Sequence, residues 1–170
     1  MIKIPPYLKK GDTIGLVCPA GHMAMEKVQT CIDTLQEWGY PVKIGTSVGS
    51  QSTTYFSGTD DERLKDFQQM LEDDEVKAVC CARGGYGMSR IIDQVSFKKF
   101  KKQPKWIIGY SDITLLHSHL YTNYYISSLH APMAAAFNDG GAQNPFVRSL
   151  KDALEGKKLK YQCPVHEFNK

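Results

Sequence analysis

The sequence predicts an α/β fold, with a single domain built on an open, mainly parallel sheet that has helices on both faces. Three observations predict it. Short apolar runs alternate along the chain with segments whose apolar residues recur at helical spacing, most connections between them are short, and no internal repeat or low-complexity tract interrupts the order. Strands and helices that alternate in this way build a parallel sheet that is buried on both faces.

The composition agrees with one globular domain. A chain of 170 residues, 42% of them hydrophobic, buries roughly two thirds of its unfolded surface and needs no disulfide or metal to form a core. The 21 basic and 18 acidic residues nearly cancel, so nucleic-acid binding is not indicated. No apolar run reaches the ~20 residues that cross a bilayer, and residues 1–6 (MIKIPP) do not begin a signal peptide. We therefore expect a cytoplasmic protein with no membrane partner.

The five cysteines are odd in number and lack the C-x-x-C spacing of a zinc site. Cys18, Cys80 and Cys81 lie in apolar, strand-like runs, where cysteine is usually a small buried hydrophobe. Neighbouring strand residues face opposite sides of a sheet, so Cys80 and Cys81 cannot serve one site. We expect reduced thiols.

The first half of the chain predicts three strands and two helices. The apolar run 13–18 ends at a Pro-Ala-Gly turn, as a buried strand does. Apolar residues recur at helical spacing from 25 to 38, and Gly39 follows where glycine favours a helix end. Residues 59–62 (TDDE) match a capping box that begins the second helix. The remaining segments are strands 42–44 and 76–82. A Ser-, Thr- and Gly-rich loop at 45–58, whose only aromatics are Tyr55 and Phe56, joins the first of these strands to the second helix.

The second half continues the alternation. It predicts a short helical stretch at 87–93, a lysine-rich connection, strand 106–109, helix 112–124, strand 126–129 and a helix at 146–154. The last residues have mixed polarity and no clear periodicity. We therefore expect the domain to occupy 1–154 and residues 155–170 to begin a linker toward a part that this chain lacks.

Two turns are the best candidates for chemistry, because ligands of open parallel sheets bind beyond the carboxyl ends of the strands. In the turn 109–114 (GYSDIT), Ser111 stands between a buried strand and a helix, as in a nucleophile elbow, and the amide of Asp112 can donate to a developing oxyanion. The pattern G-x-S-x-G is incomplete, because Ile113 occupies the second glycine position. The structural alternative is that Ser111 or Asp112 only caps the helix.

The other turn, 82–87 (ARGGYG), follows the preceding strand. Gly84 and Gly85 let the main chain approach a ligand and bring a second backbone donor toward the same oxygen, while Arg83 offers a planar fork that suits a carboxylate. Tyr86 is a candidate lining residue. The turn fails as a dinucleotide fingerprint and as a phosphate loop, since it lacks the acidic residue of the first and the Gly-Lys-Ser/Thr of the second. A tight turn with Arg83 paired to a carboxylate is the structural alternative.

The histidines are weaker candidates, and the sequence predicts no metal site. His117 and His119 are two residues apart on a helix and point about 200° apart, so they do not share a metal, and we expect packing roles. His130 closes the fifth strand and His22 follows the first, both at the ligand edge of the sheet, but we favour structural roles for them. His166 lies in the irregular tail and is a poor candidate for a triad.

These motifs resemble the LD-carboxypeptidase family of serine peptidases, also called muramoyltetrapeptide carboxypeptidases, which includes the microcin C immunity peptidases. The likeness spans most of the chain. It departs slightly at Ala131, where the family usually has glycine. The matching segments, in order, are 11–15 (GDTIG), 58–63 (GTDDER), 82–87 (ARGGYG), 109–114 (GYSDIT) and 130–133 (HAPM).

The resemblance implies the site. Ser111 would be the nucleophile, the amides of Gly85 and Asp112 would form the oxyanion hole, and we expect Arg83, Gly84 and Tyr86 to bind substrate. The family's Ser-Glu-His triad takes its Glu and His from a C-terminal domain, so no residue here is assigned to them, and Ser111 without a base should be nearly inert. The expected sheet is flavodoxin-like, or like that of class I glutamine amidotransferases.

The resemblance also implies the reaction. The complete enzyme would release terminal D-alanine from murein tetrapeptides in cytoplasmic peptidoglycan recycling, by hydrolysing the amide that joins it to an L-centre through an acyl-enzyme. The family needs no cofactor or metal and suggests a homodimer. Two alternatives stay open: an immunity peptidase that cleaves an acyl-sulfamoyl adenylate conjugate, and a catalytically silent domain whose loop 83–87 holds a small carboxylate or sugar peptide.

Overall fold

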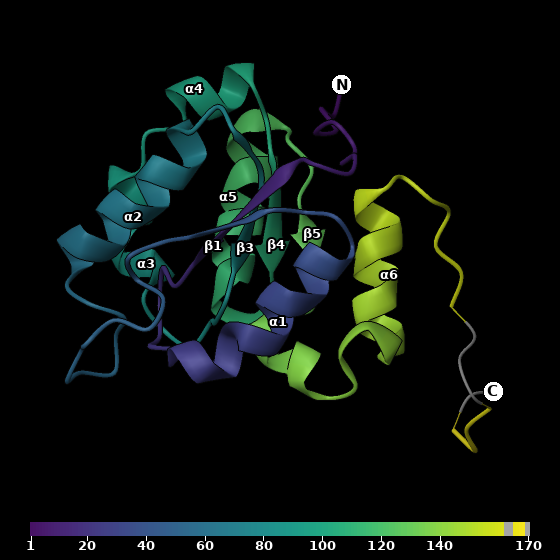
Figure 1. Cartoon of the computed structure of the whole chain (residues 1–170). Helices are drawn as coiled ribbons and strands as arrows, with labels where there is room; N and C mark the ends of the chain where they lie inside the picture. The colour runs from purple at the N-terminus through teal and green to yellow at the C-terminus, as the bar shows by residue number, and fades with distance from the viewer. Residues whose placement is uncertain (162–164, 169–170) are drawn as a thin grey trace.

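The computed structural model describes residues 1–161 and 165–168 and confirms the predicted α/β fold. Five parallel strands form one sheet in the order β2-β1-β3-β4-β5 (Figure 1). This order is that of flavodoxin-like doubly wound folds. The strands are β1 Thr13–Val17, β2 Val42–Ile44, β3 Val76–Cys81, β4 Trp106–Gly109 and β5 Leu129–His130. The helices are α1 Met25–Glu37, α2 Asp60–Glu72, α3 Met88–Ile91, α4 Lys98–Lys102, α5 Thr114–Tyr124 and α6 Pro145–Leu154.

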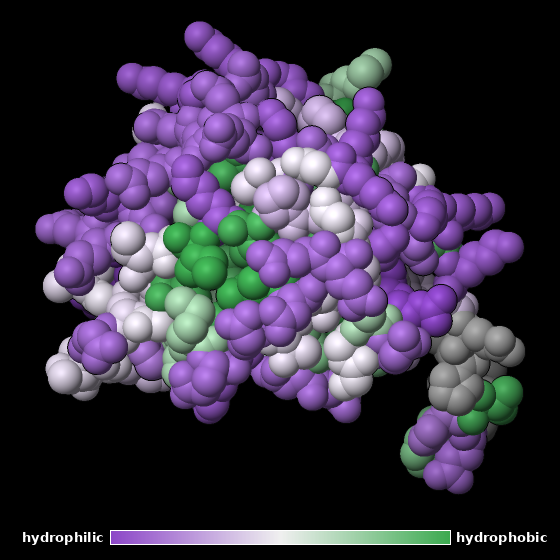
Figure 2. Space-filling model, viewed as in Figure 1, coloured by the Kyte–Doolittle hydropathy of each residue, from purple (hydrophilic) through white to green (hydrophobic). Residues whose placement is uncertain are grey.

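Helices cover both faces of the sheet. Buried side chains of α1 and α6, such as Leu35 and Leu150, pack on one face, while α2 and α5 pack Phe67 and Leu116 on the other. In Figure 1, α1 crosses in front of the sheet and α5 lies behind it. Hydrophilic side chains cover most of the face in view, with an apolar area near its centre (Figure 2). The polar outer sides of the helices therefore meet solvent, and the apolar sides form two core layers.

The cysteines behave as the alternation of a strand predicts. Cys80 joins one core layer and Cys81 the other. The four cysteines within the described ranges are buried and free, namely Cys18, Cys31, Cys80 and Cys81. Burial raises the pKa of Cys18 to about 12, which favours the protonated thiol at neutral pH. The fifth cysteine lies outside the described residues.

Some predicted boundaries are wrong. The fifth strand is Leu129–His130 rather than 126–129, because Ile126 instead forms an isolated parallel bridge with Lys3 of the N-terminal segment. The helix predicted at 112–124 begins as a 3-10 helix, Ser111–Ile113, before α5. The stretch predicted at 87–93 is likewise α3 followed by a 3-10 turn. The first of these differences arises from a contact between distant segments, which the local pattern does not contain.

The second helix begins as predicted. Thr59 accepts a hydrogen bond from the amide of Glu62, whose carboxylate accepts one in return from the amide of Thr59 at 2.8 Å. One turn further along α2, the buried Asp66 accepts hydrogen bonds from the amides of Thr46 at 2.9 Å and Ser47 at 3.0 Å. Through Asp66, α2 thus fixes the first residues of the long loop that precedes it.

Candidate active site

The candidate elbow joins β4 to α5. Ser111 has φ +62°, in the left-handed region that residues other than glycine rarely adopt. Its side chain is exposed, and no side chain caps the 3-10 helix or α5. The serine therefore turns sharply out of the sheet without spending its hydroxyl on the helix that follows.

Packing beneath the elbow explains its departure from the G-x-S-x-G pattern. Ile113 occupies the second glycine position and is fully buried. A Cβ added to Gly109 would lie 2.9 Å from Cγ2 of Ile113. The branched side chain fits because the last residue of β4 has no side chain.

The turn after β3 packs directly against the elbow. A Cβ added to Gly84 would lie 3.2 Å from Cβ of Ser111 and 3.4 Å from the amide nitrogen of Asp112. The carboxylate of Asp112 accepts a hydrogen bond at 2.9 Å from the amide of Met88, at the start of α3. Asp112 therefore ties the two turns together instead of capping its own helix.

Within the glycine-rich turn, Gly85 is exposed, whereas Gly84 and Gly87 are buried. Gly85 has φ +104°, a conformation that L side chains rarely adopt, and Tyr86 beside it is half exposed. Arg83 is exposed, and its Nη1 donates to the carbonyl of His22 at 2.7 Å. The structural alternative that paired Arg83 with a carboxylate does not match this contact.

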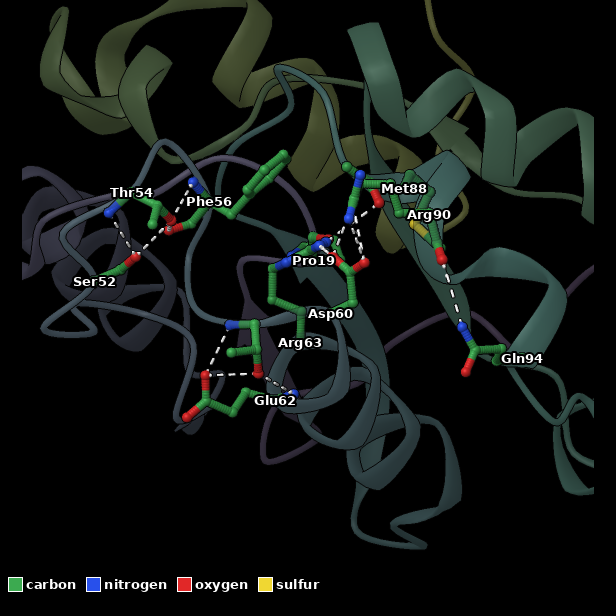
Figure 3. A network of polar contacts seen from close by, with 12 residues as sticks. Pro19, Ser52, Thr54, Phe56, Asp60, Glu62, Arg63, Met88, Arg90 and Gln94 are labelled. Atoms are coloured by element: carbon green, nitrogen blue, oxygen red, sulfur yellow. Dashed lines mark hydrogen bonds and ion pairs between the residues drawn. The ribbon is translucent and has the colours of Figure 1, made fainter.

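A buried arginine that the sequence did not single out holds this turn in place. The side chain of Arg63, on α2, is fully buried, and its Nη1 donates to the carbonyls of Pro19 and Gly87, the latter at 3.2 Å (Figure 3). Its Nη2 pairs with Asp60, which also bonds Nε of Arg90 at 3.0 Å. Burial lowers the pKa of Arg63. One side chain thus joins the turns after β1 and β3 to the start of α2.

Comparison with known proteins identifies the family. The model of the LD-carboxypeptidase N-terminal domain matches residues 14–131. This chain belongs to the LD-carboxypeptidase family. It is 44% identical over 129 residues to the probable murein peptide carboxypeptidase of Bacillus subtilis, covering 76% of this chain and 40% of that protein. It is 27% identical over 122 residues to the murein tetrapeptide carboxypeptidase of Pseudomonas aeruginosa, covering 71% and 39%.

Solved structures show the same fold. The microcin C7 self-immunity protein MccF in complex with glutamyl sulfamoyl guanosine superposes with a TM-score of 0.81 at 23% identity, over 94% of this chain and 50% of that chain. The muramoyltetrapeptide carboxypeptidase from Oxalobacter formigenes gives 0.73 at 24% identity, over 83% and 47%. This LD-carboxypeptidase chain spans about 40% of the length of the first curated relatives that it matches.

His117 and His119 both lie on α5 but contact different parts of the fold. Nε2 of His117 lies 2.9 Å from the carbonyl oxygen of Gly109, and its Nδ1 is buried without a partner. The ring of His119 packs on Phe97 with centroids 5.1 Å apart. Since the amide of Ala131 also donates to Gly109 at 3.1 Å, the strand end before the elbow is fixed from two sides.

Of the remaining histidines, His130 lies beside the elbow, whereas His22 and His166 make other contacts. His130, at the end of β5, is exposed and lies beside Tyr110, with ring centroids 6.1 Å apart. Nε2 of His22 bonds the carbonyl of Ser50 at 3.0 Å, so His22 anchors the long loop. His166 contacts the amide of Phe168 in its own tail. Over residues 1–161 and 165–168, no group of three or more His, Cys, Asp or Glu side chains is placed to hold a metal, and no helix has the length and apolar character of a membrane span.

Two positioning residues escaped the sequence prediction. Arg63 ends the segment 58–63 that carries part of the family resemblance, but an arginine near a helix start usually faces solvent. The sequence predicts a packing role for His117, and the structure shows in addition that its ring meets the carbonyl of Gly109 at the end of β4. Both act on main-chain carbonyls, which leave no pattern in a sequence.

Proposed function

We propose that this chain is the nucleophile domain, residues 1–154, of a serine LD-carboxypeptidase that releases terminal D-alanine from murein tetrapeptides. The observation that carries the proposal is the conformation of Ser111 just after β4. The residue is exposed, its φ is +62°, and its side chain does not cap the helix that follows. A strained, outward-turned serine at the carboxyl end of a parallel strand is the arrangement of a nucleophile elbow. The 44% identity to a relative described as a murein peptide carboxypeptidase favours this substrate class.

The residues divide the work as follows. Oγ of Ser111 attacks the carbonyl carbon of the scissile amide, and the carbonyl oxygen takes up the negative charge. The amides of Gly85 and Asp112 donate to that oxyanion, and Arg83, Gly84 and Tyr86 bind the peptide. Collapse of the tetrahedral intermediate releases D-alanine with its amine protonated and leaves an acyl-enzyme, which water hydrolyses.

The base that accepts the serine proton is the part of the mechanism that this chain does not supply. The family resemblance implies a Glu and a His from a second domain, reached through a linker that begins within residues 155–170. A serine hydroxyl is a weak nucleophile without a base within ~3 Å. We therefore propose that the 170-residue chain by itself turns over no peptide, that the longer enzyme works in the cytoplasm, and that it is a homodimer, which light scattering of that enzyme would test.

Release of D-alanine tests the catalytic proposal. The 170-residue chain should release none from a murein tetrapeptide, whereas its fusion to the part of the Bacillus subtilis relative outside the matched segment should release it. In that fusion, Ser111→Ala should abolish release, and the control Ser118→Ala, on the exposed side of α5, should not. Robust turnover by the unfused chain would contradict the account of the triad.

Binding tests the site without the missing base. In an amide-resolved NMR titration of the 170-residue chain, the tetrapeptide should shift the amide signals of Gly85 and Asp112, and Ser111→Ala should leave this binding intact. A peptide that binds tightly while Ser111→Ala keeps the fusion fully active would instead favour the silent binding domain. An acyl-sulfamoyl adenosine that outcompetes the tetrapeptide would favour the immunity branch, since the microcin C7 self-immunity protein MccF of Escherichia coli is 27% identical to this chain over 128 residues.

A further inference from the structure

The last part of the loop between β2 and α2 lies across the candidate site. We call residues 50–58 the strap. Its backbone pairs with the turn after β1: Phe56 forms an antiparallel bridge with Gly21, the amide of His22 donates to the carbonyl of Tyr55 at 3.0 Å, and the amide of Ser57 donates to that of Ala20 at 3.1 Å. These bonds fix the strap at the edge of the sheet where the strands end.

An aromatic side chain fastens the strap a second time. The guanidinium carbons of Arg63 and Arg90 lie 5.0 and 5.3 Å from the ring centroid of Phe56, within the range of a cation–π contact. The ring of Tyr86, on the glycine-rich turn, lies 6.0 Å from the same ring. Phe56 is drawn beside Arg63 and Arg90 in Figure 3. The strap therefore holds its position relative to both α2 and the turn after β3.

This anchoring delivers Tyr55 to the site. Its ring meets that of Phe56 edge-on, with centroids 5.5 Å apart and an interplanar angle of 88°. A Cβ added to Gly85 would overlap Oη of Tyr55 and lie 3.1 Å from its Cζ. The tyrosine is 52% exposed. A phenol hydroxyl thus lies against the residue whose amide we assign to the oxyanion hole, and its tyrosine stays half exposed to solvent.

Tyr55 and Arg83 are attached to the same main-chain residue. The amide of His22 donates to the carbonyl of Tyr55, and the carbonyl of His22 accepts from Nη1 of Arg83 at 2.7 Å. A hydroxyl donor from the strap and the guanidinium of Arg83, from the glycine-rich turn itself, are therefore both anchored through His22. A ligand with an anionic oxygen at one end fits such a pair, because hydrogen bonds to ionised acceptors are stronger than those to neutral ones.

From these contacts we infer that Tyr55 is a substrate-contacting residue that selects peptides with a free terminal carboxylate. Its hydroxyl donates a hydrogen bond to that carboxylate. The carbonyl oxygen of the scissile amide then faces the amides of Gly85 and Asp112. The inference rests on the proposed function, since it places the carboxylate of the leaving residue beside the scissile bond. It also accounts for Gly85, because any side chain there would displace the phenol.

A titration of the 170-residue chain with two peptides tests the inference. The probes are the murein tetrapeptide and the same peptide with a terminal carboxamide. Tyr55→Phe keeps the ring on Phe56 and removes only the hydroxyl, so affinity for the free acid should fall about tenfold while affinity for the amide stays within about twofold. Tyr121→Phe, a control on the 55% exposed tyrosine of α5, should change neither.

Three results would overturn it. If Tyr55→Phe and the unaltered chain bound the free acid with equal affinity, Tyr55 would not donate a hydrogen bond to the carboxylate, while the proposed function would stand. Tighter binding of both peptides by Tyr55→Ala would show that the ring only obstructs Gly85. Failure of the unaltered chain to bind either peptide would reject the proposed function, and the role of Tyr55 with it.

Discussion

The two turns that meet at the candidate site are built on opposite principles. The elbow after β4 presents a side chain and therefore keeps a serine at φ +62°, whereas the turn after β3 presents its backbone and uses Gly85 at φ +104° and Gly87 at φ +149°. The elbow is held from directly beneath by Gly109 and Ile113. The glycine turn is held by a residue distant in sequence, because the buried side chain of Arg63 on α2 donates to the carbonyl of Gly87. The strained backbone at Ser111 is thus secured by local packing, and the glycine turn by a hydrogen-bonding anchor from another element.

Replacing the anchor should have the largest effect. Arg63→Met keeps much of the buried volume but leaves the carbonyls of Pro19 and Gly87 without their donor and Asp60 without one partner. We expect the free energy of unfolding to fall by about 3 kcal/mol, as when one member of a buried polar network is removed. Urea denaturation measures this loss.

The matched control is the other arginine on the same carboxylate. Arg90 is 44% exposed and bonds Asp60 from the solvent side. Arg90→Met should cost far less than Arg63→Met, because exposed ion pairs contribute little. If the two substitutions destabilised the chain equally, burial of Arg63 would not be what holds the glycine turn.

The packing beneath the elbow should give the second largest effect. Gly109→Ala places a Cβ 2.9 Å from Ile113 in the core, and we expect a loss of about 2 kcal/mol from overpacking. Combining it with Ile113→Ala should cost at least about 1 kcal/mol less than the sum of the two single changes, because the second makes room for the first. Denaturant melts of the four proteins close this cycle.

Gly15→Ala offers a control at the same nominal distance. A Cβ at Gly15, on β1, also meets its neighbour at 2.9 Å, but that neighbour is the sulfur of Met70. A thioether moves easily, so this change should be milder than Gly109→Ala. A larger loss at Gly15 would show that the elbow is packed no more tightly than the rest of the sheet.

These two turns also mark how far the sequence could be read. The elbow was predicted in outline because a buried strand, a serine and a helix follow one another within a few residues. The anchor was not, because Arg63 reaches Pro19 and Gly87 only after α2 has packed on the sheet. The start of β5 was misplaced for the same reason, since Ile126 pairs with Lys3 from the far end of the chain. Patterns within about ten residues predict the elements and the elbow, whereas contacts between residues far apart in the sequence leave no such pattern.

Backbone strain at Ser111 should give a smaller effect. At φ +62° an alanine bears the left-handed cost and a glycine does not, so Ser111→Gly should be more stable than Ser111→Ala by about 1 kcal/mol. In the exposed middle of α5 the order should reverse, with Ser118→Gly less stable than Ser118→Ala by about 1 kcal/mol. Thermal melts of the four variants check both signs. The same order at both positions would mean that the elbow is relaxed in solution.

The smallest effect concerns the imidazole that holds the strand end before the elbow. Burial lowers the pKa of His117 below its ordinary 6.5, because removing the charged ring from water costs more than its hydrogen bond to the carbonyl of Gly109 returns. Protonation therefore favours the unfolded chain, so this contribution to stability is complete above about pH 6.5 and declines as the pH falls below it. We expect the melting temperature of the unaltered chain to drop more between about pH 8 and about pH 5.5 than that of His117→Gln, whereas His166→Gln, in the exposed tail, should keep the full drop. Parallel curves for all three proteins would show that His117 titrates alike in the folded and unfolded chain, and the elbow would then depend on packing alone.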